Sequence, residues 1–163
     1  KAELRTRGEA FSENVRLGIM IEIPSIAMAA DLAAREVDFA SIGTNDLCQY
    51  LFAADRMNPD LSAYAQPFAP AFLRILQNIL SAFKTAGKEI SMCGELAGDP
   101  RATALLIGLG LQKLSMSASA VPAVKLALSR IGAMQAESLA AEATGLATQA
   151  EVIGLLIKHG LWK

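Results

Sequence analysis

One arrangement recurs four times along the chain and limits its fold more than any other feature. Each time, an apolar run typical of a buried strand ends in a few polar or acidic residues, and an amphipathic segment follows. The polar tails are Glu22-Ile23-Pro24, Gly43-Thr44-Asn45-Asp46-Leu47, Met92-Cys93-Gly94-Glu95 and Ser115-Met116-Ser117. Strands that alternate with helices predict a parallel sheet. Because the carboxyl ends of parallel strands meet at one edge, we expect these tails to form an enzyme's active site.

The predicted strands cover residues 17–23, 37–42, 89–93 and 112–116. Their continuous apolar runs favour strands that are covered on both faces. Predicted helices cover residues 24–35, a segment capped by Asn45 or Asp46, a segment from Pro67 or Pro70 to residue 86, residues 99–109, and three stretches after Ser119. Residues 55–66 are predicted to be a loop. Four strand-helix units make half of an eight-stranded barrel. An open half barrel exposes sheet edges, so we expect a fragment, or a chain that completes its barrel against a partner.

Composition excludes several classes of function. Of the 163 residues, 53% are hydrophobic and 19% are charged, which predicts a globular core rather than disorder. The net charge of −1 gives no electrostatic reason to expect a nucleic-acid or acidic-membrane partner. Only Cys48 and Cys93 carry thiols, far apart in the sequence, which favours a reducing cytoplasm over a disulfide framework or a zinc site. No apolar run reaches the ~18 residues of a membrane span.

Two acids stand at equivalent places after the first and second predicted strands. Glu22 ends an apolar run, and a carboxylate there is costly unless it meets a cation or a metal. Asp46 follows the next strand. Two such oxygen donors suit Mg²⁺, which keeps several waters and takes few protein carboxylates. The structural alternative is that Asp46 caps a helix and that Glu22 pairs with a lysine or arginine.

Cys93 lies at the end of the third predicted strand, with Glu95 two residues on. An unperturbed cysteine thiol is mostly protonated at neutral pH and could donate a proton to a carbanion. The alternative is a small buried hydrophobic residue, the usual state of a free cysteine, and we assign Cys48 to that class. Arg56 could grip a phosphate or a carboxylate, or could form a loop salt bridge with Asp55. The only histidine, His159, is predicted to be structural or solvated.

The order and spacing of these motifs resemble those of the phosphoenolpyruvate (PEP)-utilising enzymes. The resemblance covers residues 16–131 and is carried by Gly18-Ile19-Met20-Ile21-Glu22-Ile23-Pro24, Ser41-Ile42-Gly43-Thr44-Asn45-Asp46-Leu47, Asp55-Arg56, and Met92-Cys93-Gly94-Glu95 with Ala97-Gly98-Asp99. Two further segments, 54–58 and 114–118, are more similar to enzyme I of bacterial sugar phosphotransferase systems than to pyruvate phosphate dikinase or PEP synthase. The dikinases usually have a longer acidic segment and a Ser-Cys-Ser-Pro tail at these places.

The resemblance implies that residues 1–163 are the carboxyl-terminal half of a (β/α)8 TIM barrel that binds PEP, followed by carboxyl-terminal helices. By matching position, Glu22 and Asp46 would bind Mg²⁺, Asn45 and Arg56 would grip the phosphate, and Cys93 would protonate the enolate carbon to give pyruvate. Gly94 would keep space beside the thiol, and we add Glu95 as a supporting partner of Cys93.

The resemblance also implies partners and a setting. The phosphoryl group would pass to a histidine on another domain and then to a phosphocarrier protein of sugar transport, in a cytoplasmic homodimer. The acceptor histidine and the family's other phosphate-gripping arginines lie upstream of this chain, so we expect it to be inactive alone. Ala69, in Pro67-Phe68-Ala69-Pro70, replaces a frequent histidine, and Cys48 replaces a frequent threonine. A dikinase-type enzyme and a non-catalytic assembly or regulatory module remain as alternatives.

Overall fold

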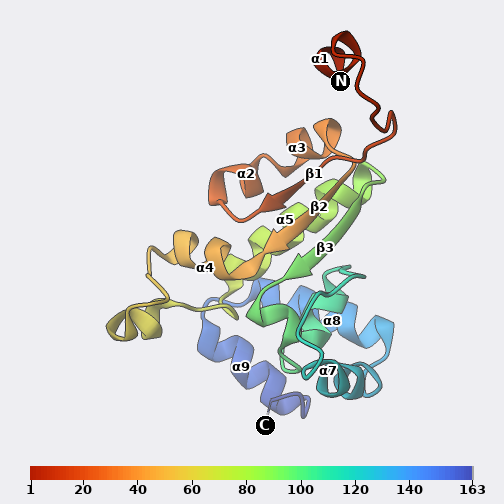
Figure 1. The fold of residues 1–163 in the computed structure, drawn as a ribbon. Coiled ribbons are helices and arrows are strands. Elements are labelled where there is room, and N and C mark those ends of the chain that lie inside the picture. Colours follow the sequence, from red (N-terminus) through yellow and green to blue (C-terminus); the bar gives the residue numbers. More distant parts are fainter. Residues whose placement is uncertain (163) are drawn as a thin grey trace.

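The structure, a computed structural model, describes residues 1–162 and is built around a small parallel sheet (Figure 1). Strands β1 (Gly18–Ile21), β2 (Phe39–Gly43) and β3 (Glu89–Cys93) lie side by side in sequence order, and both pairings are parallel. Three predicted strands and the α/β class are therefore confirmed. The carboxyl ends of the three strands share one edge, because Gly43 pairs with Cys93 and Ile21 pairs with Ile42.

The fourth predicted strand is much shorter than residues 112–116. It is reduced to one parallel bridge between Met92 and Leu114. The Met92 amide donates to the carbonyl of Lys113 (3.0 Å), and the Ser115 amide donates to the carbonyl of Met92 (2.8 Å). Polar residues surround Leu114 in this run, so there is little apolar surface to bury by a longer pairing. The bridge nevertheless places this segment next to β3, in the predicted order.

The helices fill the connections between the strands and the carboxyl-terminal third of the chain (Figure 1). They are α1 (Ala2–Thr6), α2 (Pro24–Met28), α3 (Ala30–Glu36), α4 (Thr44–Phe52), the 3₁₀-helix η1 (Pro59–Tyr64), α5 (Pro70–Thr85), the 3₁₀-helix η2 (Glu95–Gly98), α6 (Thr103–Gly108), α7 (Val121–Leu128), α8 (Ala133–Gly145) and α9 (Gln149–Lys158). Within residues 1–162, no helix combines the length and the hydropathy that crossing a bilayer requires.

Three predicted helix boundaries were wrong. The helix expected over residues 24–35 breaks at Ala29, so α2 and α3 are separate. The loop expected over residues 55–66 contains η1, where the Asn58 side chain accepts from the Asp60 amide (3.0 Å). The helix expected from Asp99 begins only at Thr103. The carboxylate of Asp99 accepts from the Arg101 amide (2.9 Å), which holds the chain in a turn before α6.

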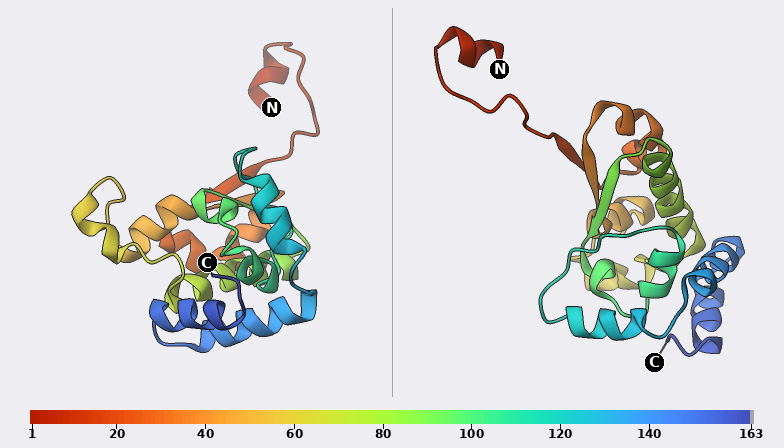
Figure 2. Two further views of the ribbon diagram at one scale, coloured as in Figure 1. Left: turned by 90° about the horizontal axis from the view of Figure 1, so that it is seen from below. Right: turned by 90° about the vertical axis from the view of Figure 1, so that its right-hand side faces the viewer.

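Helix α5 covers one face of the sheet and supplies much of the core. Its side chains at helical spacing are almost completely buried, namely Phe72, Leu73, Leu76, Ile79, Leu80 and Phe83. Helices α2 and α3 pack against α5 on this same side, as the two views of Figure 2 also show. Ile21, Ile42 and Met92, one from each strand, face this layer and are fully buried. Because alternate residues of a strand point to opposite faces, the burial of these three side chains against the helices places their strand neighbours on the opposite face of the sheet.

The opposite face of the sheet is partly open. Met20 of β1 is 47% exposed and Phe39 of β2 is 37% exposed. Their neighbours in register on this face include Ser41 and Ser91. Among residues 1–162, the expectation of strands covered on both faces is therefore met on one face only, and the other face leaves Met20 and Phe39 partly exposed beside the polar Ser41 and Ser91. Residues 1–15 with α1 extend away from the sheet (Figure 1).

Candidate active site at the carboxyl edge of the sheet

Glu22 lies directly after β1, and its side chain crosses over the end of β2. A β-carbon at Gly43 would come within 2.9 Å of Glu22 Oε2, so the carboxylate rests against the β2 backbone where only glycine leaves room. Glu22 is half-buried, and within residues 1–162 no lysine or arginine nitrogen lies within 4.0 Å of its carboxylate. The alternative of a salt bridge for Glu22 thus finds no support in this part of the chain.

Cys93 is the last residue of β3, at the same edge of the sheet as Glu22. Its Sγ lies 3.6 Å from both Met20 Sδ and the carbonyl oxygen of Ile42, so the thiol sits over β2 on the open face of the sheet. The side chain is half-buried, in contrast to a core cysteine. Cys48 behaves as predicted: it is 8% exposed, and burial raises the pKa of its thiol to about 11.

The first turn of α4 grips the segment that follows β3. Thr44 Oγ1 donates to the carbonyl oxygen of Cys93 (2.8 Å), and Asn45 Oδ1 accepts from the amide of Glu95 (3.0 Å). Gly94 lies between these two bonds with a φ of 97°, and a β-carbon there would collide with Thr44 Oγ1. The space beside Gly94 is therefore filled by Thr44 and Asn45.

Asp46 lies within α4 and does not cap it, because the helix begins at Thr44 and Gly43 is its N-cap residue. The structural alternative for Asp46 as a helix cap is therefore wrong. The carboxylate instead faces the loop after α4, where Arg56 Nη2 lies 3.8 Å from Asp46 Oδ1. The alternative pairing of Arg56 with Asp55 is also wrong: within residues 1–162 the ion pair of Arg56 is with Asp46, and Asp55 Oδ1 accepts from the backbone amide of Met57 (2.9 Å).

Two neighbouring hollows open at this edge. One, of about 520 Å³, is lined by Cys93, Gly94 and Gly98 together with Ser115 and Ser117 of the fourth polar tail. The other, of about 460 Å³, is lined by residues that include Arg56 and Arg101. Asn45 and Glu95 line both hollows and stand at their common wall. A small anionic ligand in this region would therefore meet the thiol on one side and Arg56 on the other.

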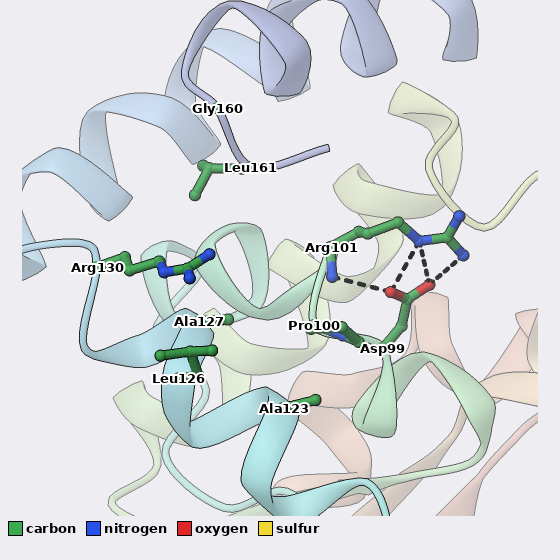
Figure 3. Close-up of a pocket in the computed structure, with 9 residues that line it drawn as sticks. All are labelled: Asp99, Pro100, Arg101, Ala123, Leu126, Ala127, Arg130, Gly160 and Leu161. Carbon is green, nitrogen blue, oxygen red and sulfur yellow. Dashed lines mark hydrogen bonds and ion pairs between the residues drawn. The ribbon is translucent and has the colours of Figure 1, made fainter. Parts of the chain in front are cut away.

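A further hollow, of about 620 Å³, lies between the turn before α6 and the end of α7 (Figure 3). Arg101 and Arg130 both line it. Arg101 is committed elsewhere: it forms an ion pair of 2.7 Å with Asp99, and its guanidinium lies 4.4 Å from the ring centroid of Trp162. The hydrogen bond and the charge of Asp99 raise the pKa of the Arg101 guanidinium above its ordinary value. Arg101 therefore serves to fasten the carboxyl-terminal segment to this turn.

Sequence reasoning missed part of the local arrangement. Thr44 stands inside a polar tail that the sequence singled out, but its bond to the Cys93 carbonyl spans 49 residues and has no local signature. Ser115 and Ser117 were also seen only as a polar tail, and the structure places them in the same hollow as Cys93. His159 follows α9 and is exposed, as predicted for a solvated residue.

The carboxylates at this edge suit a Mg²⁺ ion that is held by few protein ligands, rather than an ion enclosed by protein side chains. Among residues 1–162, no group of three or more His, Cys, Asp or Glu side chains comes together. Glu22 and Asp46 nevertheless supply one carboxylate from each of two adjacent strand ends. Mg²⁺ commonly takes one or two carboxylates and completes its octahedron with waters and substrate oxygens. The Glu22 carboxylate is available to such an ion, because no lysine or arginine in the described chain is paired with it.

Comparison with known proteins identifies the family of this chain. The family described as "PEP-utilising enzyme, PEP-binding domain" matches residues 1–133. Proteins named phosphoenolpyruvate-protein phosphotransferase are similar along nearly the whole chain: that of Listeria monocytogenes is 46% identical over 159 residues, and that of Bacillus subtilis is 44% identical over 156 residues. These stretches cover 98% and 96% of this chain but only 28% and 27% of the relatives. The chain therefore belongs to the PEP-utilising enzyme family, through that family's PEP-binding domain.

Proposed function

We propose that this chain is the carboxyl-terminal half of the PEP-binding barrel of a phosphoenolpyruvate-protein phosphotransferase. The names of its relatives support this assignment, and the chain spans little more than a quarter of their length. The sheet is consistent with half of a (β/α)8 barrel, since its strands run parallel and in sequence order, with the fourth segment bridged to β3. The half-exposed residues of the open face would then point into the barrel interior.

The proposed reaction breaks the bond between phosphorus and the enol oxygen of PEP. The phosphoryl group passes to a histidine nitrogen on a domain outside this chain, and the enolate remains. Cys93 then donates its proton to the enolate carbon, which gives pyruvate and leaves a thiolate that regains a proton from water. The observation that carries this proposal is that Glu22, Asn45, Asp46 and Cys93 all stand at one edge of the sheet, on three adjacent strand ends.

The other side chains at this edge would bind the substrate. Arg56 would grip a phosphate oxygen with its guanidinium, and Asn45 would present its amide nitrogen, because its oxygen is already held by the Glu95 amide. Glu22 and Asp46 would hold Mg²⁺. When bound, that ion would offset charge on the departing phosphoryl group. Glu95 borders both hollows and is proposed to support Cys93.

The proposed partners follow from the same assignment. A phosphocarrier protein would receive the phosphoryl group from the histidine domain, and sugar transport would be the process served. The parent protein would be a homodimer, as the resemblance to enzyme I implies. We propose a cytoplasmic location, where free thiols such as Cys48 and Cys93 persist.

The test uses the full-length parent protein and measures PEP binding by calorimetry with and without Mg²⁺. We expect Glu22→Gln to remove the Mg²⁺-dependent part of the affinity, because it removes a charge that the fold does not neutralise. The matched control is Glu137→Gln, which changes an exposed acid on α8. Equal Mg²⁺-dependent affinity in Glu22→Gln and in the unmodified protein would rule out the metal role. Transfer of phosphate from PEP to a carrier by residues 1–163 alone would contradict the fragment assignment.

A further inference from the structure

We infer that Thr44 is the positioning residue of Cys93: its hydroxyl fixes the backbone that carries the thiol. Only the role of the Cys93 thiol as a proton donor rests on the proposed function. The contact between Thr44 and the Cys93 backbone does not depend on it. The hydroxyl of Thr44 donates to the carbonyl oxygen of Cys93 at 2.8 Å, and Thr44 is 2% exposed. Burial restricts where the Thr44 side chain can lie, so its hydroxyl is a fixed donor for the Cys93 carbonyl.

The peptide after Cys93 needs such a restraint. Gly94 has φ 97° and ψ −179°, a conformation that is essentially confined to glycine. Glycine also has the widest choice of other conformations, so nothing in Gly94 itself holds the chain in this one. Two hydrogen bonds with α4 hold it instead: Thr44 donates to the carbonyl of the residue before Gly94, and Asn45 accepts from the amide of the residue after it. The pair clamps the turn from both sides.

The thiol position follows from the backbone position. Cys93 Sγ reaches the Ile42 carbonyl and Met20 Sδ at 3.6 Å each, and these contacts are long and weak even for sulfur. They cannot hold the side chain if the Cys93 carbonyl rotates away from Thr44. A displacement of about 1 Å at a reacting atom can cost ~100-fold in rate. Thr44 therefore governs the placement of the proton donor without touching the substrate.

The first experiment needs no substrate and uses the full-length parent protein. It measures the rate of Cys93 alkylation by iodoacetamide at fixed pH, resolved from Cys48 by mass spectrometry. Thr44→Val removes the hydroxyl and keeps the shape, and we expect alkylation at least ~3-fold faster because the thiol is released from its fixed position. Thr44→Ser keeps the hydroxyl and is expected to restore the original rate. Should Thr44→Val fail to give a native circular dichroism spectrum, the smaller Thr44→Ala replaces it.

A matched control separates positioning from general destabilisation. Thr103 is fully buried, and its hydroxyl also donates to a backbone carbonyl, that of Asp99 (3.2 Å), away from the thiol. Thr103→Val is expected to lower stability by a similar amount and to leave the Cys93 rate unchanged. The inference is overturned if Thr44→Val leaves the rate unchanged, if Thr44→Ser changes it equally, or if Thr103→Val has the same effect.

The second experiment uses the parent protein and measures pyruvate release. We expect Thr44→Val to lower kcat by about 10- to 100-fold with little change in the KM for PEP, because it displaces the proton donor and leaves Arg56 and Asn45 in place. The two experiments fail differently. If alkylation responds to Thr44 but Cys93→Ala still releases pyruvate at the normal rate, the positioning stands and the proposed role of Cys93 is wrong. If Cys93→Ala abolishes release but Thr44→Val changes neither measurement, the positioning is wrong.

Discussion

Arg56 Nη2 lies 3.8 Å from Asp46 Oδ1, so the proposed phosphate-binding cation is paired with a proposed metal-binding carboxylate. The two side chains are 47% and 40% exposed, and ion pairs that exposed contribute at most ~1 kcal/mol to stability. The pair is therefore easily separated. A ligand that carries an anionic group and arrives with a cation could bind Arg56 through the first and Asp46 through the second. The fold would lose little stability when the two side chains separate.

The first prediction concerns this pair. Arg56→Gln should change the free energy of unfolding by less than ~1 kcal/mol in urea titrations. The same change should weaken PEP binding to the parent protein by about 10- to 100-fold, since a charged hydrogen bond is worth ~1.5–3 kcal/mol. Arg35→Gln is the control, because it breaks a similar exposed pair with Asp31 (3.6 Å) on α3. Equal losses of PEP affinity in both variants would contradict the role of Arg56.

The second prediction concerns Gly94. Gly94→Ala adds a β-carbon against Thr44 Oγ1 at a positive φ, so it should lower the free energy of unfolding by ~2 kcal/mol or more. Gly87→Ala is the matched control: φ is 64° there, but open space surrounds the site, so only the backbone strain of ~1 kcal/mol remains. Urea denaturation of both variants measures the difference. Equal destabilisation would show that the contact with Thr44 is unimportant.

The third prediction separates the two thiols. Because burial raises the pKa of Cys48 to about 11, fewer than ~1 in 1000 molecules carry its thiolate at pH 7.5. Iodoacetamide at that pH should therefore modify Cys93 and leave Cys48 unmodified, as read from peptide masses. The rate at Cys48 should rise about tenfold per pH unit while the fold remains intact. Modification of Cys48 as fast as that of Cys93 at pH 7.5 would contradict its burial.

The fourth prediction concerns the amino ends of the strands. Hydrogen bonds from Lys113 and then Arg16 lower the pKa of Glu89 below its ordinary value of 4.5. As pH falls, the Glu89 carboxylate is protonated in the unfolded chain before it is protonated in the folded chain. The stabilisation by Glu89 is therefore present above pH ~4.5 and is lost as pH falls through the pKa of Glu89 in the folded chain.

The stability of Glu89→Gln should therefore approach that of the unmodified chain below pH 4 and fall short of it near pH 7. Urea midpoints between pH 3 and 7 measure this difference. Added salt should shrink it, because all three side chains are exposed. Glu142→Gln on α8 serves as the control that should show no such trend. A difference that is constant across the whole pH range would exclude the ion pairs as its source.

Local patterns were sufficient for the strand ends and insufficient for the contacts between them. The ends of β1, β2 and β3 follow from apolar runs and polar tails, so Glu22, Asn45 and Cys93 could be placed at one edge. The break at Ala29 could not be foreseen, because it accompanies a bond of 2.9 Å from Asn78 Nδ2 to the carbonyl of Ala27, 51 residues earlier. The pairing of Arg56 likewise depends on how the loop after α4 folds back.

The register of the sheet has a consequence for how this chain can change. At the amino ends of the strands, Glu89 is in register with Phe39, and it binds Arg16 and Lys113. At the carboxyl ends, Cys93 is in register with Gly43. The sheet thus carries surface ion pairs at the amino ends of its strands and the proposed proton donor at their carboxyl ends. Substitutions of the ion pairs at the amino ends are therefore expected to alter acid stability and to leave the geometry around Cys93 unchanged, because the length of the strands separates the two ends.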